Sequence, residues 1–192
     1  MPFLVSAVAA SLAVVAPLST TSSTSSTSTT PRHGPGVHGQ FEAAGTGTHR
    51  AVTFDKKAVP EKSRVAVVER KGKDGTRVGL RVRGLQGSRT YGAHVHQKPC
   101  GNAPDDSGAH YQNVKDPKSP SVDPKYANAQ NEVWLDFTTD KRGNGRSADT
   151  VKWRFRAGEA RSVVIHEHAT ETAPGKAGTA GARLACVNVP FD

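Results

Sequence analysis

Two histidines separated by a single residue are the strongest chemical signal in this chain of 192 residues. His94 and His96 stand in the segment Gly92-Ala-His-Val-His-Gln97, shortly before one of the chain's two cysteines. If this segment is a strand, both imidazoles project from one face with Cα atoms about 7 Å apart, while Val95 projects from the other. Two imidazoles at that spacing can bind one metal ion, since imidazole is the commonest metal ligand in proteins. Surface histidines, or histidines satisfied within a core, are the alternative interpretation of this motif alone.

The segments that would position this pair have the composition of an all-β domain. Short valine-rich runs that alternate with polar residues are separated by turns of Gly, Asp and Asn, a pattern typical of strands. The expected strands are 51–54, 63–70, 76–83, 91–97, 131–139, 149–155, 160–168 and 183–189. We expect these eight strands to form a Greek-key β-barrel or sandwich. Two glycine-rich segments between them, 100–130 and 169–182, are expected to be long functional loops.

The N-terminal region has a different composition from the rest of the chain. A run of small and apolar residues predicts a signal peptide at 1–18, although no Lys or Arg follows Met1, and a misassigned start codon is the alternative. The Ser/Thr- and Gly-rich stretch 19–45 predicts a disordered linker, which leaves 46–192 as the β-domain. Export predicts a secreted or cell-envelope protein, in which two distant cysteines favour one disulfide. After the N-terminus, no run reaches the roughly 18 apolar residues of a membrane span.

The formal net charge of +9 belongs entirely to the chain after residue 30, because the first 30 residues carry no charged side chain. Such an excess could indicate a nucleic acid, an anionic surface or a small anionic substrate. The basic residues are scattered along the sequence and lack the aromatic interleaving of single-strand binders. The charge alone therefore favours a solvated basic surface, and we expect no nucleic-acid partner.

Five motifs, in this order, resemble the copper–zinc superoxide dismutase family over roughly residues 46–190. They are Gly92-Ala-His94-Val-His96, Cys100, Gly108-Ala-His110, Val163-Val-Ile-His166-Glu167 and Gly181-Ala-Arg183-Leu-Ala-Cys186. The resemblance implies that His94, His96, His110 and His166 are copper ligands, a set of four nitrogens that suits Cu(II). It also implies an intrachain disulfide between Cys100 and Cys186.

The same resemblance implies catalytic roles for Arg183 and His110. Arg183 matches the family's arginine that guides the superoxide anion by charge-assisted hydrogen bonds. His110 matches the histidine that leaves copper in the reduced state and carries a proton. The chain is thus expected to be a secreted superoxide dismutase that converts superoxide into O₂ and hydrogen peroxide. A non-enzymatic copper-binding or structural envelope protein on the same fold is the alternative, and the oligomeric state is left open.

The zinc ligands of the family have no match in this sequence. The family binds zinc through the histidine matched by His110, two further histidines and an aspartate, but no histidine occurs between Tyr111 and Glu132. The family's His-X-Gly-Asp motif is replaced by Gln-Asn-Glu-Val at 130–133. Asp116, Asp123 and Glu132 are present, but carboxylates alone do not make a normal zinc site. We therefore expect copper and no zinc.

The missing zinc site also removes the family's group that orients His96. Glu167 and Glu171 are the candidates that the sequence offers for this role, because metal-bound histidines usually donate their second ring N–H to a carboxylate, a carbonyl or water.

Overall fold

The computed structural model describes residues 1–4, 36–45 and 50–191. Most of the predicted signal peptide at 1–18 and the greater part of the predicted linker at 19–45 lie outside these residues. The chain divides into two units, Met1–Pro31 and Arg32–Asp192, and every strand of the described residues belongs to the second. In these described ranges there is no helix of the length and apolar character that crossing a membrane requires.

The second unit contains two main sheets and one short ribbon. The first sheet has the order β1 (Gly36–Gln40), β4 (Arg64–Gly72), β5 (Gly75–Arg83) and β9 (Gly145–Val151). The second has the order β2 (Glu42–Ala43), β3 (Ala51–Thr53), β11 (Arg183–Asn188), β10 (Ser162–His166) and β7 (Ala93–His96). The ribbon pairs β6 (Thr90–Tyr91) with β8 (Phe137–Thr138), and a 3₁₀ helix, η1, spans Pro104–Ser107.

Eight of the described strands are three residues or longer, and the chain passes repeatedly from one sheet to the other. It runs from β1 in the first sheet to β3 in the second, returns for the β4–β5 hairpin, and crosses again to β7, back to β9 and finally to the β10–β11 pair. Such crossing connections are typical of Greek-key sandwiches. The predicted all-β Greek-key fold is confirmed, although one of these eight strands, β1, is not among the eight expected and the expected strand 131–139 is reduced to β8.

The core lies between the two sheets, because strand alternation turns every second side chain inward. Val78, Leu80 and Val82 of β5 belong to the same buried cluster as Val163 and Ile165 of β10. Each sheet therefore has one face in the core and one facing outward, and the outward faces hold the features described below.

Two expected strands differ from those in the structure. The segment 131–139 forms a strand only at its end, in β8, because its earlier residues make single hydrogen bonds to different segments and no continuous ladder. Leu135 N donates to the carbonyl of Ala93, and Trp134 N donates to the carboxylate of Asp149. The strand expected at 149–155 is observed earlier in the chain, as β9. Trp153 and Phe155 leave the ladder, and their rings pack in tilted and edge-to-face contacts against that of Tyr111.

The strands β1 and β2 lie in residues that the sequence analysis assigns to the linker. All five residues of β1 pair with β4, so the first sheet begins at Gly36. Val37 is the one apolar side chain of this strand, and it is only half-buried. An edge strand of this kind is held by main-chain hydrogen bonds and has almost no hydrophobic pattern that the sequence could show.

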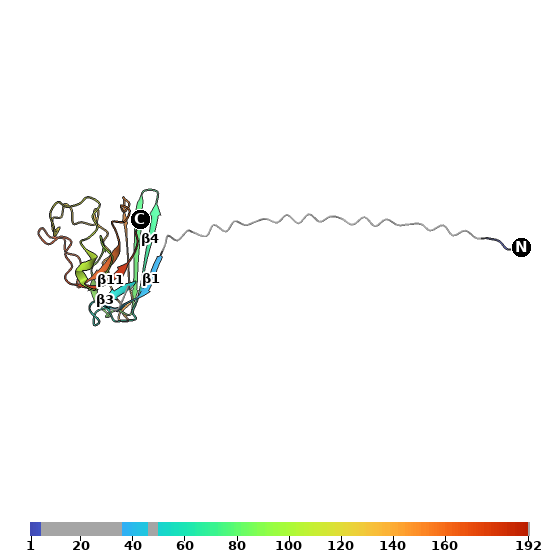
Figure 1. Cartoon of the computed structure of the whole chain (residues 1–192), viewed down its shortest axis with the longest axis horizontal. Coiled ribbons are helices and arrows are strands. Elements are labelled where there is room, and N and C mark those ends of the chain that lie inside the picture. The colour runs from blue at the N-terminus through green and yellow to red at the C-terminus, as the bar shows by residue number, and fades with distance from the viewer. Residues whose placement is uncertain (5–35, 46–49, 192) are drawn as a thin grey trace. The chain divides into compact units, whose positions relative to one another are not determined.

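Both long loops lie on the side of β11 that faces away from β4 (Figure 1). The first loop, residues 97–136, includes η1, and the second covers residues 167–182. A disulfide joins Cys100, at the start of the first loop, to Cys186 of β11, which confirms the predicted pairing. In the chain-entropy model, closing a loop of this length stabilises the folded state by on the order of 4 to 5 kcal/mol.

Candidate metal centre

The strand β7 presents His94 and His96 on one face, as the sequence predicts. Its other two residues, Ala93 and Val95, belong to the core between the sheets. Both histidines therefore point out of the second sheet, and both are nevertheless 0% exposed because the loops cover them. The pair lies in a closed site on the outer face of the sheet.

His166 and His110 reach this site from neighbouring segments. Val164 of β10 pairs with His94, so His166, two residues further along β10, lies on the same outward face. His110 forms an isolated β-bridge with His96, and a 2.8 Å hydrogen bond from Tyr111 N to the Val95 carbonyl fixes this bridge. One ring nitrogen from each of the four histidines lies within 4.8 Å of the others.

Backbone carbonyls hold two of the rings in one tautomer. Nδ1 of His96 lies 2.9 Å from the carbonyl oxygen of Gly108, and Nδ1 of His166 lies 3.4 Å from that of Gly181. Because a carbonyl can only accept, each Nδ1 carries the proton and each Nε2 keeps a free lone pair. The two Nε2 atoms lie 3.3 Å apart. Gly108 has a φ of 71°, a left-handed conformation that glycine adopts without strain.

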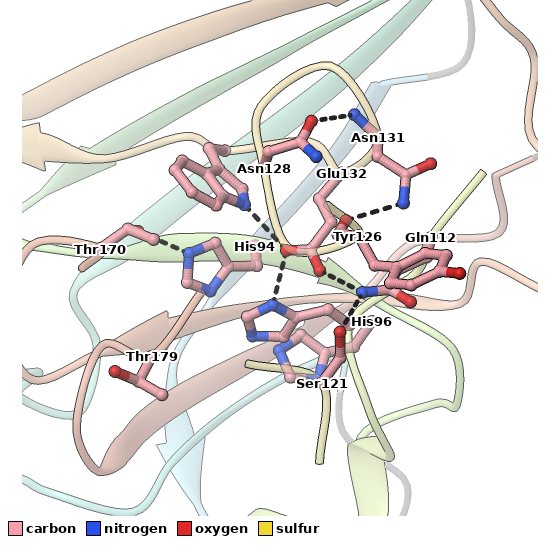
Figure 2. Close-up of polar contacts among 12 residues, drawn as sticks. His94, His96, Gln112, Ser121, Tyr126, Asn128, Asn131, Glu132, Thr170 and Thr179 are labelled. Atoms are coloured by element: carbon pink, nitrogen blue, oxygen red, sulfur yellow. Dashed lines mark hydrogen bonds and ion pairs between the residues drawn. The ribbon is translucent and has the colours of Figure 1, made fainter. Parts of the chain in front are cut away.

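His94 is oriented through its other nitrogen by a side-chain relay. Its Nε2 lies 2.6 Å from Oγ1 of Thr170 (Figure 2). That hydroxyl donates at 2.7 Å to Oδ1 of Asp136. The hydroxyl proton is thereby used, so His94 Nε2 must donate and Nδ1 has the lone pair. This Nδ1 is buried and has no hydrogen-bond partner among the described residues. An orphaned buried nitrogen is costly unless something such as a metal ion binds it.

His110 is held by a buried carboxylate, that of Glu132. Its Nδ1 lies 2.8 Å from Oε2 of Glu132, and the indole N–H of Trp134 donates to the same oxygen at 2.8 Å. Gln112 donates at 2.8 Å to the other oxygen of this carboxylate, and Figure 2 shows Glu132 at the centre of the network. His110 Nδ1 is therefore a donor, which leaves its Nε2 for a metal.

The electrostatic environment keeps the buried rings neutral. Burial lowers the pKa of His94 and His96 well below 6.5, and the neighbouring histidines lower both pKa values further. Burial likewise lowers the pKa of His166 to about 3. Neutral imidazole is the form that binds a metal. A set of four imidazole nitrogens, one of them orphaned and buried, is compatible with copper.

Arg183 lines a cavity of about 570 Å³ together with His110 and His166. Its Nη1 donates to the Pro104 carbonyl and to Ser107 Oγ at 3.1 and 2.9 Å, so η1 fixes the guanidinium. Burial lowers the pKa of Arg183 below its usual value, but arginine stays charged in proteins. Among the described residues, its Nη2 has no hydrogen-bond partner and can donate to an anion in the cavity.

The carboxylates that the sequence offered to orient His96 have other partners. Glu167 accepts a hydrogen bond from Ala182 N, and Glu171 interacts with Lys176 and Thr179. That prediction is wrong because the Gly108 carbonyl already occupies Nδ1 of His96.

The structure adds three groups that the sequence reasoning did not find: Glu132 as the partner of His110, Thr170, and the Gly108 carbonyl. Only Glu132 left a sequence signal, as an acidic residue beside the apolar alternation that begins at Val133. Asp116 and Asp123 bind groups of the long loop instead. Across the described ranges, the four histidines are the one cluster of three or more potential metal-binding side chains.

The long loop is held by its own polar contacts. The buried amide of Asn131 bonds to both backbone groups of Val114 and to the Tyr126 carbonyl. The guanidinium of Arg156 donates to the carbonyls of Gln112 and Asn113. These contacts fix the loop that contains His110 and Gln112.

Comparison with known proteins agrees with this geometry. The family model for copper/zinc superoxide dismutase matches residues 61–189. The Cu/Zn superoxide dismutase from Brucella abortus is 17% identical, with a TM-score of 0.52 over 81% of this chain and 99% of that one. A SOD-like protein from Bacillus subtilis is 15% identical, with a TM-score of 0.51 over 72% of this chain and 97% of that one. These identities show a shared fold, and no curated protein sequence matches the chain. Because the matched region covers well over half of its length, the chain belongs to the copper/zinc superoxide dismutase family.

Proposed function

We propose that this protein is a copper-dependent superoxide dismutase that acts outside the cytoplasm. One observation carries the proposal: four histidines converge beside a cavity that is lined by Arg183. In each histidine, one ring nitrogen is held by a neighbouring group of the protein, and the other ring nitrogen is free to bind a metal. Copper bound by His94, His96, His110 and His166 would supply the one-electron couple that oxidises one superoxide to O₂ and, with two protons, reduces another to hydrogen peroxide.

The chain's own residues would bind the anion and hold a proton. Arg183 is fixed by η1 with its Nη2 directed to no protein acceptor, so it can dock an anion by a charge-assisted hydrogen bond. Its charge would also speed encounter by steering superoxide into the cavity. His110 can hold a proton at Nε2 while Glu132 keeps the ring in place through Nδ1. A copper carrier would have no use for a fixed guanidinium in this cavity.

We also propose that the carboxylate of Glu132 replaces zinc as the partner of His110, so that the protein binds copper alone. Glu132 is 1% exposed and its two oxygens accept from three side chains, which leaves little room for a cation. The disulfide supports an oxidising location. The proposed organisation is completed by a signal peptide at 1–18 and a linker that starts at residue 19 and ends where β1 begins, so that β1 and β2 are the first strands of the β-domain.

The test is a dismutation assay on protein loaded with copper and zinc together, alongside elemental analysis. We expect one copper per chain, no tightly held zinc, and a rate proportional to copper content. The double variant His94→Ala/His96→Ala is the matched control and should have neither copper nor activity. Full copper loading without dismutation would favour the non-enzymatic alternative, and one equivalent of tightly held zinc would contradict the copper-only site.

A further inference from the structure

The outward face of the first sheet holds a groove walled by arginines. We call it the arginine groove and define it by the exposed Arg70, Arg77, Arg81 and Arg146 and by the floor residues Val68, Gly79 and Ala148. Its volume is about 690 Å³. These side chains project away from the core, since Val67, Val78 and Leu80, their neighbours in sequence, are buried in it.

The register of three strands creates this shape. Val68 of β4, Gly79 of β5 and Ala148 of β9 lie side by side and form a low floor that runs across the strands. On one side of the floor Arg70 lies opposite Arg77, and on the other Arg81 lies opposite Arg146. Arg77 and Arg81 are four residues apart on β5, so the two walls rise about 14 Å apart. A Cβ added at Gly79 would meet only the Val68 carbonyl, at 4.0 Å, so the space above the floor is open.

The charge arrangement is unfavourable for the isolated protein. Like charges directly opposite each other in an antiparallel pair are destabilising, and this face contains two such pairs in the groove and a third, Arg64 opposite Arg83, beside it. Of the described residues that line the groove, none is Asp or Glu. Arg77 makes a hydrogen bond to Thr150, and no ion pair to a wall arginine occurs in the described part of the chain.

A carboxylate does occur beside the groove. Asp140 lines the adjoining hollow with Arg81, Arg83 and Arg146. It accepts hydrogen bonds from Arg142 N and from the backbone and side chain of Asn144, so its oxygens are used within its own turn. An ordinary solvated surface intersperses both signs of charge, whereas here the arginines gather around one floor. An external anion would offset their mutual repulsion.

The groove and the metal centre lie on opposite faces of the sandwich. His94 and His96 point outward from the second sheet, and the wall arginines point outward from the first, with the core between them. The groove is therefore no part of the path by which a small anion would reach Arg183. The chemistry of the metal centre therefore does not explain the charge of the groove.

We propose that the arginine groove binds a linear acidic polysaccharide, with its sulfate or carboxylate groups held by the two arginine walls and the chain lying over the floor. Guanidinium forks match such oxyanions in a bidentate way, which a lysine cannot do. Paired walls on both sides of an open channel suit a polymer with regularly repeated anionic groups.

Two other anionic partners fit less well. Single-stranded nucleic acid is bound through stacking of bases on aromatic rings, and no Phe, Tyr or Trp is among the described residues that line the groove. A membrane surface is bound by amphipathic elements that bury apolar side chains. The large exposed apolar residues of the described chain are Met1, Phe3, Leu4 and Val114, and none of them lines the groove.

Calorimetric titration of the full chain with two probes tests the proposal: a heparin oligosaccharide for sulfate and an oligogalacturonate for carboxylate. The test variant replaces Arg70, Arg77, Arg81 and Arg146 with Gln. The matched control makes the same change in net charge at exposed positions outside the groove, by replacing Lys57, Lys125, Lys152 and Arg161 with Gln. A third variant, Gly79→Tyr, fills the floor and keeps every arginine. Oligothymidylate and anionic phospholipid vesicles serve as competing ligand classes.

We expect the wild type to bind at least one of the two polysaccharides at 0.15 M salt. The four-arginine variant should lose roughly tenfold or more in affinity and show a shallower dependence on salt, because fewer counterions are exchanged. Gly79→Tyr should also weaken binding, while the control should change it less than about twofold. Copper content should be the same in all variants, which checks the fold. If the four-arginine variant does not fold, the same titration is made with the double variant Arg81→Gln/Arg146→Gln and with the single variant Gly79→Tyr, and both should bind the polysaccharide more weakly than the wild type.

Three results would overturn the proposal. The first is equal weakening by the control, which would show that net charge alone is responsible. The second is tighter binding of oligothymidylate or of vesicles than of either polysaccharide. The third is no measurable binding of either polysaccharide to the wild type.

Discussion

Nδ1 of His110 donates a 2.8 Å hydrogen bond to Oε2 of Glu132, a carboxylate that is itself 1% exposed. This bond decides which nitrogen of His110 faces the other three histidines. Trp134 and Gln112 donate to the same carboxylate, so its position is fixed from three directions. A buried carboxylate thus orients the ring that, in the family pattern, would be held by a second metal ion.

Replacing Glu132 with Gln should weaken copper binding about 10- to 100-fold, the usual cost of losing a group that orients a metal-bound histidine. An amide cannot accept from His110, Trp134 and Gln112 together without turning one of its own N–H groups toward a donor. Competition with a copper chelator measures the affinity, and the electron paramagnetic resonance spectrum reports the change at the ring. Glu61→Gln, at an exposed site, is the control. Unchanged affinity and spectrum in Glu132→Gln would contradict the role assigned to Glu132.

Thr170→Val should weaken copper binding about tenfold, because it removes the acceptor that fixes His94 Nε2 and keeps the volume of the side chain. Thr170→Ser retains the hydroxyl and should restore the affinity. Both variants are compared by chelator competition and by thermal unfolding without metal. Equal loss in Thr170→Ser and Thr170→Val would show that packing, rather than the hydrogen bond, is what matters at this position.

Arg183→Ala should leave copper bound and slow dismutation, since the anion loses its docking group and part of the local positive field. The loss should be larger at low ionic strength, where the Debye length is roughly 30 Å at 0.01 M against 10 Å at 0.1 M. Rates measured against salt at equal copper content check this, with Arg161→Ala as an exposed control. Superimposable salt profiles for Arg183→Ala and the wild type would remove Arg183 from the mechanism.

The double variant Cys100→Ser/Cys186→Ser should lower the free energy of unfolding by about 2 to 5 kcal/mol. The bond joins the first long loop to β11, and its loss frees a large loop in the unfolded chain. Urea unfolding of the metal-free protein measures the difference, and reduction of the wild type with a phosphine should give the same value. A variant as stable as the oxidised wild type would contradict this account.

The metal-free protein should lose stability as the pH falls below about 6.5. Burial lowers the pKa of His94, His96 and His166 in the folded state, so in this range the unfolded chain binds protons that the folded chain does not. Each such group contributes a slope of up to about 1.4 kcal/mol per pH unit between 6.5 and its folded pKa. Urea unfolding at pH 7, 6 and 5 measures the slope, and the exposed His38→Gln should leave it unchanged. A free energy of unfolding that stays constant over this range would show that the three histidines are not buried in the metal-free protein.

The sequence by itself determined the parts of the site that depend on local geometry. The two-residue period of a strand places His94 and His96 on one face, and the core position of Val95 confirms it. The alternation along 76–83 likewise predicted both the buried face and the basic face of β5. Family motifs supplied the disulfide partners and the set of four histidines, because those residues carry their identity in short, ordered patterns.

Only the tertiary structure decided the contacts between segments that are far apart in sequence. Thr170 reaches His94 across 76 positions, and Glu132 reaches His110 across 22, and neither pairing follows from a local period. β1 joins the first sheet through main-chain bonds that leave almost no pattern in its side chains.

The arginine groove shows the same limit most clearly. Its four arginines look scattered in the sequence, and the antiparallel register of β4, β5 and β9 sets Arg70 opposite Arg77 and Arg81 opposite Arg146. Strand pairing depends on which backbones meet in the folded chain, and a shift of one residue would turn these side chains to the other face. The charge was visible in the composition, but its concentration on one face is a property of the fold.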